Sequence, residues 1–236
     1  MGKLFKYRAR NKYTDAIFTT GCLHYSHPTE FNDPYDSLLL MDISTPHFYT
    51  SQDSCGNKYL TRFGGGLISL AYQKVYDNIE IGCFSMDGCQ MQMWSHYANY
   101  HKGICLEFDE NLLMDDDMRS FAVDYKPEQQ KYPAFYPDEV SEEHLKVYYT
   151  KHQSWAYEKE VRIIHRTVEG CNGNYPFNKK SLTGICFGSK CPNRTISHYK
   201  RLCFENGFEH MKFYKMELAN QGHYELRPRL LMKIKK

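Results

Sequence analysis

The chain has 236 residues, of which 42% are hydrophobic, so it is long enough to bury a sizeable core and to fold unaided. Thirty Lys and Arg residues against 28 Asp and Glu residues give a net charge of +2, which excludes a bulk electrostatic argument for nucleic-acid or membrane binding. No apolar run approaches the ~20 residues that span a bilayer, and the N-terminus has no signal-peptide pattern. We therefore expect a cytosolic protein that does not bind membranes.

The nine cysteines are odd in number and contain no Cys-x-x-Cys pair, which predicts free thiols in a reducing compartment. No His-Glu-x-x-His or other metal-ligand spacing is present, so we expect no metal cofactor.

The N-terminal half alternates between short strands and short helices. A first helix over Thr14–Phe18 has an N-cap residue, an acid in its first turn and Gly21 as a stop signal. A second helix carries Trp94, Tyr97, Ala98 and His101 at helical spacing and ends at Gly103. The strands predicted in this half are 4–8, 23–26, 79–85 and 104–108. A glycine triplet at 64–66 is read as a hinge before a helix over 67–77.

The sequence pattern of the C-terminal half predicts two longer helices and several strands. Ser141 is a good N-cap for a helix that runs to Trp155, with apolar and aromatic residues at helical spacing. The second helix covers 193–206 and stops near Gly207. The strands predicted in this half are 121–126, 157–164, 182–188, 211–218, 224–227 and 230–234. Strands dominate, which predicts one α+β domain over residues 1–236, with central mixed, mostly antiparallel sheets and helices packed around them.

The run from Tyr157 to Ile164 is the most densely charged of the predicted strands. Side chains alternate between the two faces of a strand, so Glu158, Glu160 and Arg162 would share one face, with the two carboxylates about 6.5 Å apart. The two acids of such a pair take on distinct roles when the neighbouring carboxylate raises the pKa of one and an arginine lowers the pKa of the other. A solvated face whose acids pair with Lys or Arg remains the alternative.

Three motifs together resemble a bacterial family of uncharacterised domains. They are Phe31-Asn32-Asp33-Pro34-Tyr35-Asp36, then Trp94-Ser95-His96-Tyr97-Ala98 with His101-Lys102-Gly103, and Tyr157-Glu158-Lys159-Glu160-Val161-Arg162.

The order of parts also resembles that of ADP-ribosyltransferases: a basic first strand, a short helix ending in glycine, a second strand with Tyr or Ser, and a late strand with Glu. This resemblance implies that Arg8 contacts the phosphate or ribose of NAD, that Tyr25 and Ser26 hold the nicotinamide ribose, and that Glu160 is catalytic. The sequence departs from one branch of that superfamily, because His24-Tyr25-Ser26 stands where that branch has Ser-Thr-Ser.

Further residues are candidates for this site. Glu158 would orient or deprotonate an acceptor, although an ion pair with Arg162 is an equally good interpretation. Tyr7, Asn32, Trp94 and Tyr97 are further candidates for holding NAD. Turn formation by Asn32 and core packing by Trp94 are their alternative roles.

The sequence therefore predicts an NAD-consuming ADP-ribosyltransferase that modifies a protein or nucleic acid, as a toxin or phage-defence effector would. A non-catalytic nucleotide- or nucleic-acid-binding domain and a hydrolase that uses the carboxylate pair are the alternatives. Replacing Glu160 by Gln is expected to cost turnover on the order of 10²-fold. If the Glu160 and Arg162 pair is exposed, the stability cost would be at most about 1 kcal/mol.

Overall fold

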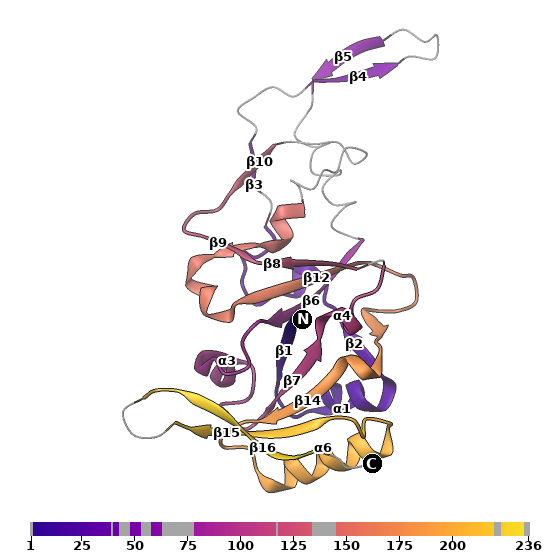
Figure 1. Ribbon diagram of the computed structural model, residues 1–236. Coiled ribbons are helices and arrows are strands. Elements are labelled where there is room, and N and C mark those ends of the chain that lie inside the picture. Colours follow the sequence, from indigo (N-terminus) through magenta and orange to yellow (C-terminus); the bar gives the residue numbers. More distant parts are fainter. Residues whose placement is uncertain are drawn as a thin grey trace.

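The computed structural model describes residues 2–38, 40–42, 48–52, 58–62, 78–116, 118–133, 145–219 and 223–233. Within these ranges the protein is α+β and is built on an eight-stranded, mostly antiparallel sheet (Figure 1), which confirms the predicted fold class. In spatial order the strands of this sheet are β16 (Leu226–Lys233), β15 (Lys212–Leu218), β14 (Leu182–Phe187), β7 (Ile104–Asp109), β1 (Lys3–Arg8), β6 (Ile79–Ser85), β12 (Glu160–Arg166) and β8 (Arg119–Ala122).

Only β14 and β15 run parallel within this sheet, and all the other neighbouring pairs are antiparallel. Most of these strands lie where the alternation of apolar residues predicted them, and β6 has the predicted bounds. The single strand predicted over 121–126 is interrupted at Val123, whose N–H donates to the carbonyl oxygen of Glu160 at 2.9 Å. That interruption separates β8 from β9 (Asp124–Lys126).

The pairing of β1 with β6 differs from that of the other central strands. These two strands share one register pair, Phe5 with Ser85, whereas β12 pairs with β6 along its whole length. Beyond that pair, β6 takes a different partner: the backbone of Ser26 exchanges hydrogen bonds of 2.9 and 3.0 Å with the backbone of Ile81. The sheet therefore opens between β1 and β6, inside the sheet.

Two helices cover one side of the sheet beside β14 and β15 (Figure 1). Helix α1 (Lys12–Thr20) is capped by the Asn11 side chain and ends at Gly21, whose φ of 69° is left-handed, so it begins two residues before the predicted helix. It packs against α6 (Asn193–Glu205) through the Phe18 and Tyr199 rings, whose centroids are 5.5 Å apart. This side holds the largest group of buried apolar residues.

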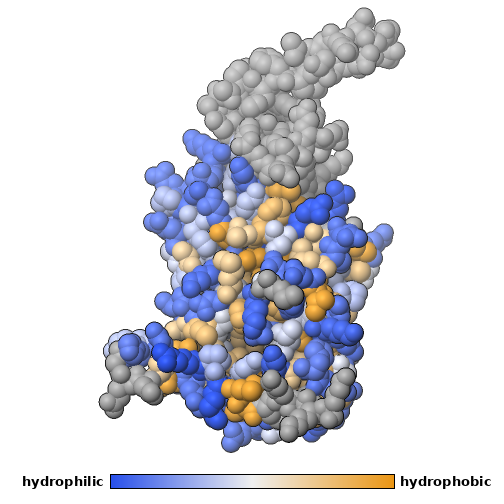
Figure 2. All heavy atoms as spheres, viewed as in Figure 1, coloured by the Kyte–Doolittle hydropathy of each residue, from blue (hydrophilic) through white to orange (hydrophobic). Residues whose placement is uncertain are grey.

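A shorter helix, α3 (Met91–His96), lies on the other side of the sheet in Figure 1. Its Trp94 packs edge-on against Tyr7 of β1, with ring centroids 5.2 Å apart, in a second buried cluster that includes Cys105 of β7. The face seen in Figure 2 is mostly hydrophilic, with hydrophobic residues gathered toward its middle. Within the described ranges, no helix has both the length and the apolar character needed to cross a membrane.

The remaining elements are short. The helical turns are α4 (Glu110–Leu113), η1 (Pro28–Glu30), η3 (Lys146–Tyr149), η4 (Gln153–Glu158) and η5 (Lys179–Ser181). The short strands form pairs, namely β2 (Cys22–His24) with β13 (Asn174–Pro176), β3 (Leu40–Asp42) with β10 (Lys131–Pro133), β4 (Phe48–Gln52) with β5 (Lys58–Arg62), and β9 with β11 (Thr150–His152).

The helix predicted from Ser141 to Trp155 is wrong over its described part. Residues 146–158 form η3, β11 and η4 instead, and residues 141–144 lie outside the described ranges. The carbonyl of Tyr148 accepts a hydrogen bond of 2.7 Å from Arg162, and Lys151 pairs in a parallel ladder with Tyr125. A continuous helix would use these backbone groups internally. The predicted glycine hinge and the helix over 67–77 also fall outside the described ranges.

Candidate functional site: a charged cavity between the central strands

A cavity of about 360 Å³ lies where β1 and β6 separate. Lys6 and Arg8 of β1 line it, and Glu158 and Glu160 border it at the start of β12. Ser85 pairs with both Phe5 and Glu160, so these three residues form one row across β1, β6 and β12. The opening of the sheet therefore brings the first strand and the late acidic segment to one site, although about 150 residues separate them in sequence.

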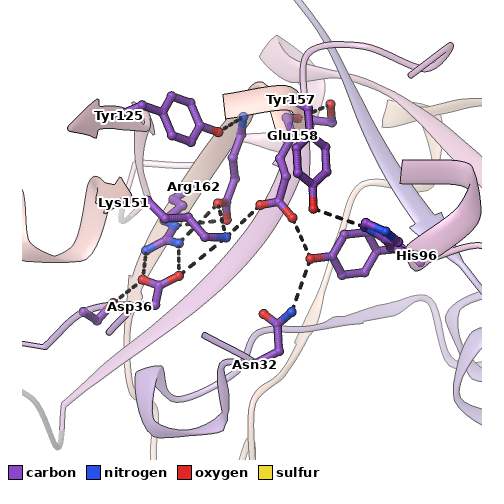
Figure 3. Close-up of polar contacts among 12 residues, drawn as sticks. Asn32, Asp36, His96, Tyr125, Lys151, Tyr157, Glu158 and Arg162 are labelled. Atoms are coloured by element: carbon purple, nitrogen blue, oxygen red, sulfur yellow. Dashed lines mark hydrogen bonds and ion pairs between the residues drawn. The ribbon is translucent and has the colours of Figure 1, made fainter. Parts of the chain in front are cut away.

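Arg162, a buried residue in the middle of β12, organises the charged cluster shown in Figure 3. Its Nη1 and Nη2 atoms donate to the two oxygens of Asp36 at 2.7 and 2.5 Å, which is a two-pronged ion pair. Its Nε donates to Glu160 Oε1 at 3.0 Å, and its guanidinium lies 5.0 Å from the centre of the Phe31 ring. The arginine thus joins β12 to the loop at 31–36.

Lys151 is the second cation of the cluster and is as deeply buried as its partners. Its Nζ lies 2.7 Å from Glu158 Oε2, 3.3 Å from Glu160 Oε2 and 3.6 Å from Asp36 Oδ2. Its side chain is 4% exposed. Because charges buried in this way are costly unless they are paired, one ammonium shared by three carboxylates holds both glutamates in fixed positions.

The two glutamates reach the cluster from different elements. Glu158 ends η4 and Glu160 begins β12, so the prediction that they share a strand face is wrong. Lys159 between them has a left-handed backbone with φ of 44°, which turns the chain at this point. Ser85 Oγ holds the turn by donating to the Glu158 carbonyl at 2.6 Å.

Glu160 stays ionised in this setting. Burial opposes its ionisation, but the charges of Arg162 and Lys151 outweigh the burial and lower the pKa of Glu160 to about 2. The Glu160 carboxylate is therefore an anion throughout the physiological pH range, and it is too weak a base to take a proton there.

The Phe31–Asp36 motif supplies three different contacts. Phe31 stacks on Arg162, Asp36 pairs with it, and Asn32 Nδ2 donates to Tyr97 Oη at 3.4 Å. Asp33 forms the turn by accepting from the Tyr35 N–H at 2.9 Å. The predicted turn is thus also a wall of the site.

The second motif forms the turn after α3, which ends at His96 and not at Gly103 as predicted. Three consecutive residues, Asn99, Tyr100 and His101, have left-handed backbones with φ of 47°, 54° and 66°. A Cβ atom on Gly103 would lie 2.3 Å from the carbonyl oxygen of Arg8, so only glycine fits there. This close contact fixes the end of β1, which carries Arg8.

Tyr97, at the C-terminus of α3, donates from its hydroxyl to Glu158 Oε1 at 2.6 Å. Tyr97→Phe removes this bond to a charged group, and we expect it to lower the free energy of unfolding by about 1–2 kcal/mol. Urea denaturation would measure the change. Tyr100→Phe, in the same turn but 72% exposed, is the matched control and is expected to change stability by less than about 0.5 kcal/mol. Equal losses in the two variants would contradict a specific role of the Tyr97 hydroxyl.

The structure brings seven of the nine predicted site residues to the cavity and leaves two, Tyr25 and Trp94, outside its lining. Among the described residues lining the cavity are Tyr7, Arg8, Ser26, Asn32, Tyr97, Glu158 and Glu160. Tyr25 is 2% exposed and packs against Tyr175, and Trp94 is fully buried and donates to the Gly88 carbonyl at 3.0 Å. The Tyr7 hydroxyl is bonded to the Asp87 carbonyl at 2.6 Å. The side chains of Tyr25 and Trp94 and the hydroxyl of Tyr7 are therefore occupied by core contacts.

Three residues of the site were missed by sequence reasoning. Lys6 shares the alternation of Arg8 along β1, so the strand pattern could have revealed it. Asp36 lies in a motif that was read only as a turn. Lys151 was placed on a predicted helix, which hid its position beside the acids. Within the described ranges, no set of three or more His, Cys, Asp or Glu side chains is arranged to hold a metal ion.

Comparison with known families gives one match. The profile of a family described as "Protein of unknown function (DUF2971)" matches residues 93–163. The matched segment contains the turn after α3 and the start of β12, and it excludes the Phe31–Asp36 loop. No curated protein and no solved structure matches the chain.

Proposed function

We propose that the protein cleaves the bond between nicotinamide and ribose in NAD and transfers ADP-ribose to a macromolecular acceptor, a protein or a nucleic acid. The observation that carries this proposal is the shared cavity, in which Arg8 of the first strand faces the same space as Glu158 and Glu160. This is the pairing of a basic first strand with a late acidic strand that the resemblance to ADP-ribosyltransferases implies.

The bonding of the two glutamates supports NAD cleavage over hydrolysis by a carboxylate pair. A glycoside hydrolase needs one protonated carboxylic acid to protonate its leaving group. Glu160, with a pKa lowered to about 2 by Arg162 and Lys151 against the effect of burial, does not supply that proton. Both oxygens of Glu158 accept hydrogen bonds, one from Tyr97 and one from Lys151, so neither carboxylate is set up to be the acid. Nicotinamide needs none, because its ring is positively charged in NAD and leaves as a neutral molecule. A permanent carboxylate beside the ribose would instead stabilise the oxocarbenium-like charge that develops as the bond breaks.

Arg8 is suited to the diphosphate of NAD. It lies partly buried beside the cavity, and its buried Nε has no hydrogen-bond partner within the described ranges. A buried guanidinium N–H without a partner is costly, and a phosphate oxygen would satisfy it.

One observation favours a second candidate, a nucleotide-binding domain without catalysis. Tyr97, Lys151 and Arg162 already bond all four carboxylate oxygens of Glu158 and Glu160. A carboxylate that is fully bonded in this way is well placed to hold the fold together.

Incubation of the purified protein with NAD separates these two functions. Nicotinamide release, measured by liquid chromatography, is expected if the proposal is correct. Saturable NAD binding in calorimetry without release would favour the binding domain. If the protein neither binds NAD nor releases nicotinamide, both proposed functions are wrong.

Arg8→Gln is expected to weaken NAD binding by about tenfold or more, because a charge-assisted bond to phosphate contributes about 1.5–3 kcal/mol. Arg10→Gln, two residues further along and exposed, is the matched control and should bind NAD as the parent does. Isothermal titration would compare the dissociation constants. An unchanged constant for Arg8→Gln would place the diphosphate elsewhere.

A further inference from the structure

The proposed transfer leaves one proton unassigned. When an acceptor hydroxyl, amine or water attacks the ribose carbon, its proton must pass to a base as the new bond forms. The two glutamates are poor candidates for this base, because their oxygens already accept hydrogen bonds from other side chains. Glu160 is bonded by Arg162 and Lys151, and its pKa is about 2; the oxygens of Glu158 are bonded by Tyr97 and Lys151.

Lys6 lies in the same cavity and is bound differently from the other buried lysine. Its Nζ donates to the carbonyl oxygen of Cys83 at 2.9 Å and lies 4.6 Å from the centre of the Phe84 ring. Whereas Lys151 has three carboxylates within 3.6 Å, the described residues place none within 4.0 Å of Lys6 Nζ. Opening of the sheet explains this contact, because the Cys83 carbonyl faces the gap where β1 no longer pairs with β6.

We propose that Lys6, in its neutral form, is the general base that accepts the acceptor's proton in the proposed NAD reaction. The inference rests on the proposed function. In the transfer step the bond between nicotinamide nitrogen and the ribose carbon breaks, and its electron pair stays on neutral nicotinamide. The acceptor atom bonds to the ribose carbon, and its proton moves to Lys6 Nζ, which becomes an ammonium and later returns the proton to water.

The surroundings of Lys6 favour the neutral amine. Burial is the main cause, and the charge of Arg8 on the same strand adds to it; together they lower the pKa of Lys6 to about 7 despite the nearby carboxylate of Glu160. On the other side of β1, the neighbouring strand β7 places the apolar Leu106 opposite Lys6. A neutral amine that donates one N–H to the Cys83 carbonyl still has a free lone pair. Because Lys6 also lines the cavity, that lone pair can accept a proton from a group bound there.

The other titratable groups that line the cavity fit the role less well. Burial raises the pKa of the Cys83 thiol and of the Tyr97 hydroxyl far above neutrality. His24 is the one histidine among the described lining residues, but its side chain is 47% exposed.

The test is the pH dependence of kcat/KM for nicotinamide release from NAD in water. In the parent protein this value is expected to fall about tenfold between pH 8 and pH 6, with a midpoint near 7, because the neutral amine is lost as the pH falls. Lys6→Met and Lys6→Arg are expected to lose this dependence and to fall on the order of 10²-fold at pH 8. Lys3 lies on the same strand, but its side chain is 60% exposed and is paired with Glu107, so Lys3→Met should keep the parent profile.

A second measurement needs no variant. Carbamylation of Lys6 in the parent by cyanate, followed by peptide mass spectrometry across pH, should show a midpoint near 7. A midpoint near 10 would overturn the proposal, as would a Lys6→Met profile like that of the parent or a profile abolished by His24→Asn alone. Those results would contradict the role of Lys6 but not NAD cleavage. If the parent protein releases no nicotinamide, both NAD cleavage and the role of Lys6 are wrong.

Discussion

Glu160→Gln is expected to slow nicotinamide release from NAD by about 100-fold or more while the protein still binds NAD. Glutamine keeps the shape of the side chain and an oxygen that accepts from Arg162 Nε, so the geometry at the start of β12 is retained. It removes the negative charge that would stabilise the oxocarbenium-like transition state. Single-turnover release measured by liquid chromatography, with NAD affinity measured by calorimetry, separates the loss of rate from a loss of binding.

The same substitution is expected to cost more stability than the sequence suggested. The expectation of about 1 kcal/mol assumed an exposed pair, but Glu160 is 5% exposed and shares its oxygens with two buried cations. A cost of several kcal/mol is expected, so rates should be compared well below the unfolding temperature. Glu169→Gln, an exposed acid after β12, is the control for both measurements. A Glu160→Gln protein that releases nicotinamide at the parent rate would show that this acid is structural.

Arg162→Leu is expected to give the largest loss of stability of the substitutions considered, about 3–5 kcal/mol. Leucine fits an apolar strand position, but it leaves the Asp36 and Glu160 carboxylates and the Tyr148 carbonyl without their main donor in a buried place. For a chain of this length the loss corresponds to a fall in melting temperature of roughly 10 °C. Differential scanning calorimetry at neutral pH would measure it.

Two further variants make this test specific. Arg166→Leu, at the exposed end of the same strand, is expected to change the melting temperature by no more than about 2 °C. Arg162→Lys keeps the charge but not the two-pronged bond to Asp36, so it should also destabilise the protein. Equal melting temperatures for Arg162→Leu and Arg166→Leu would show that the buried cluster does not stabilise the fold.

The fold was predictable from the sequence where a segment obeys one simple pattern. Alternating apolar residues gave β6 its bounds, and the Asn11 to Gly21 segment carries its own start and stop signals. The helix expected from Ser141 to Trp155 shows where the pattern misleads. Tyr148 and Lys151 have helical spacing to their neighbours, yet their backbone is drawn into contacts with Arg162 and with β9, which lie far away in sequence.

The site was predictable in its two glutamates and two arginines, but not in Asp36, Lys6 or Lys151. A motif with two glutamates and an arginine indicates charge, and Glu160 and Arg8 do line one cavity. The sequence does not indicate that Asp36 lies within 2.7 Å of Arg162 across 126 positions, because that contact depends on the complete sheet. It also does not reveal the opening between β1 and β6, which depends on where two strands cease to pair.

The buried cluster also has a charge balance of its own. Three carboxylates, those of Asp36, Glu158 and Glu160, face two cations, Lys151 and Arg162, so three minus two leaves one negative charge on this wall of the cavity. That excess would attract the positively charged ring of oxidised NAD and would offer nothing to the uncharged dihydronicotinamide of NADH. NADH, moreover, has no cationic leaving group. If the proposed function is correct, this charge would favour the oxidised dinucleotide over the reduced one, and the activity of the protein would follow the redox balance of the cell.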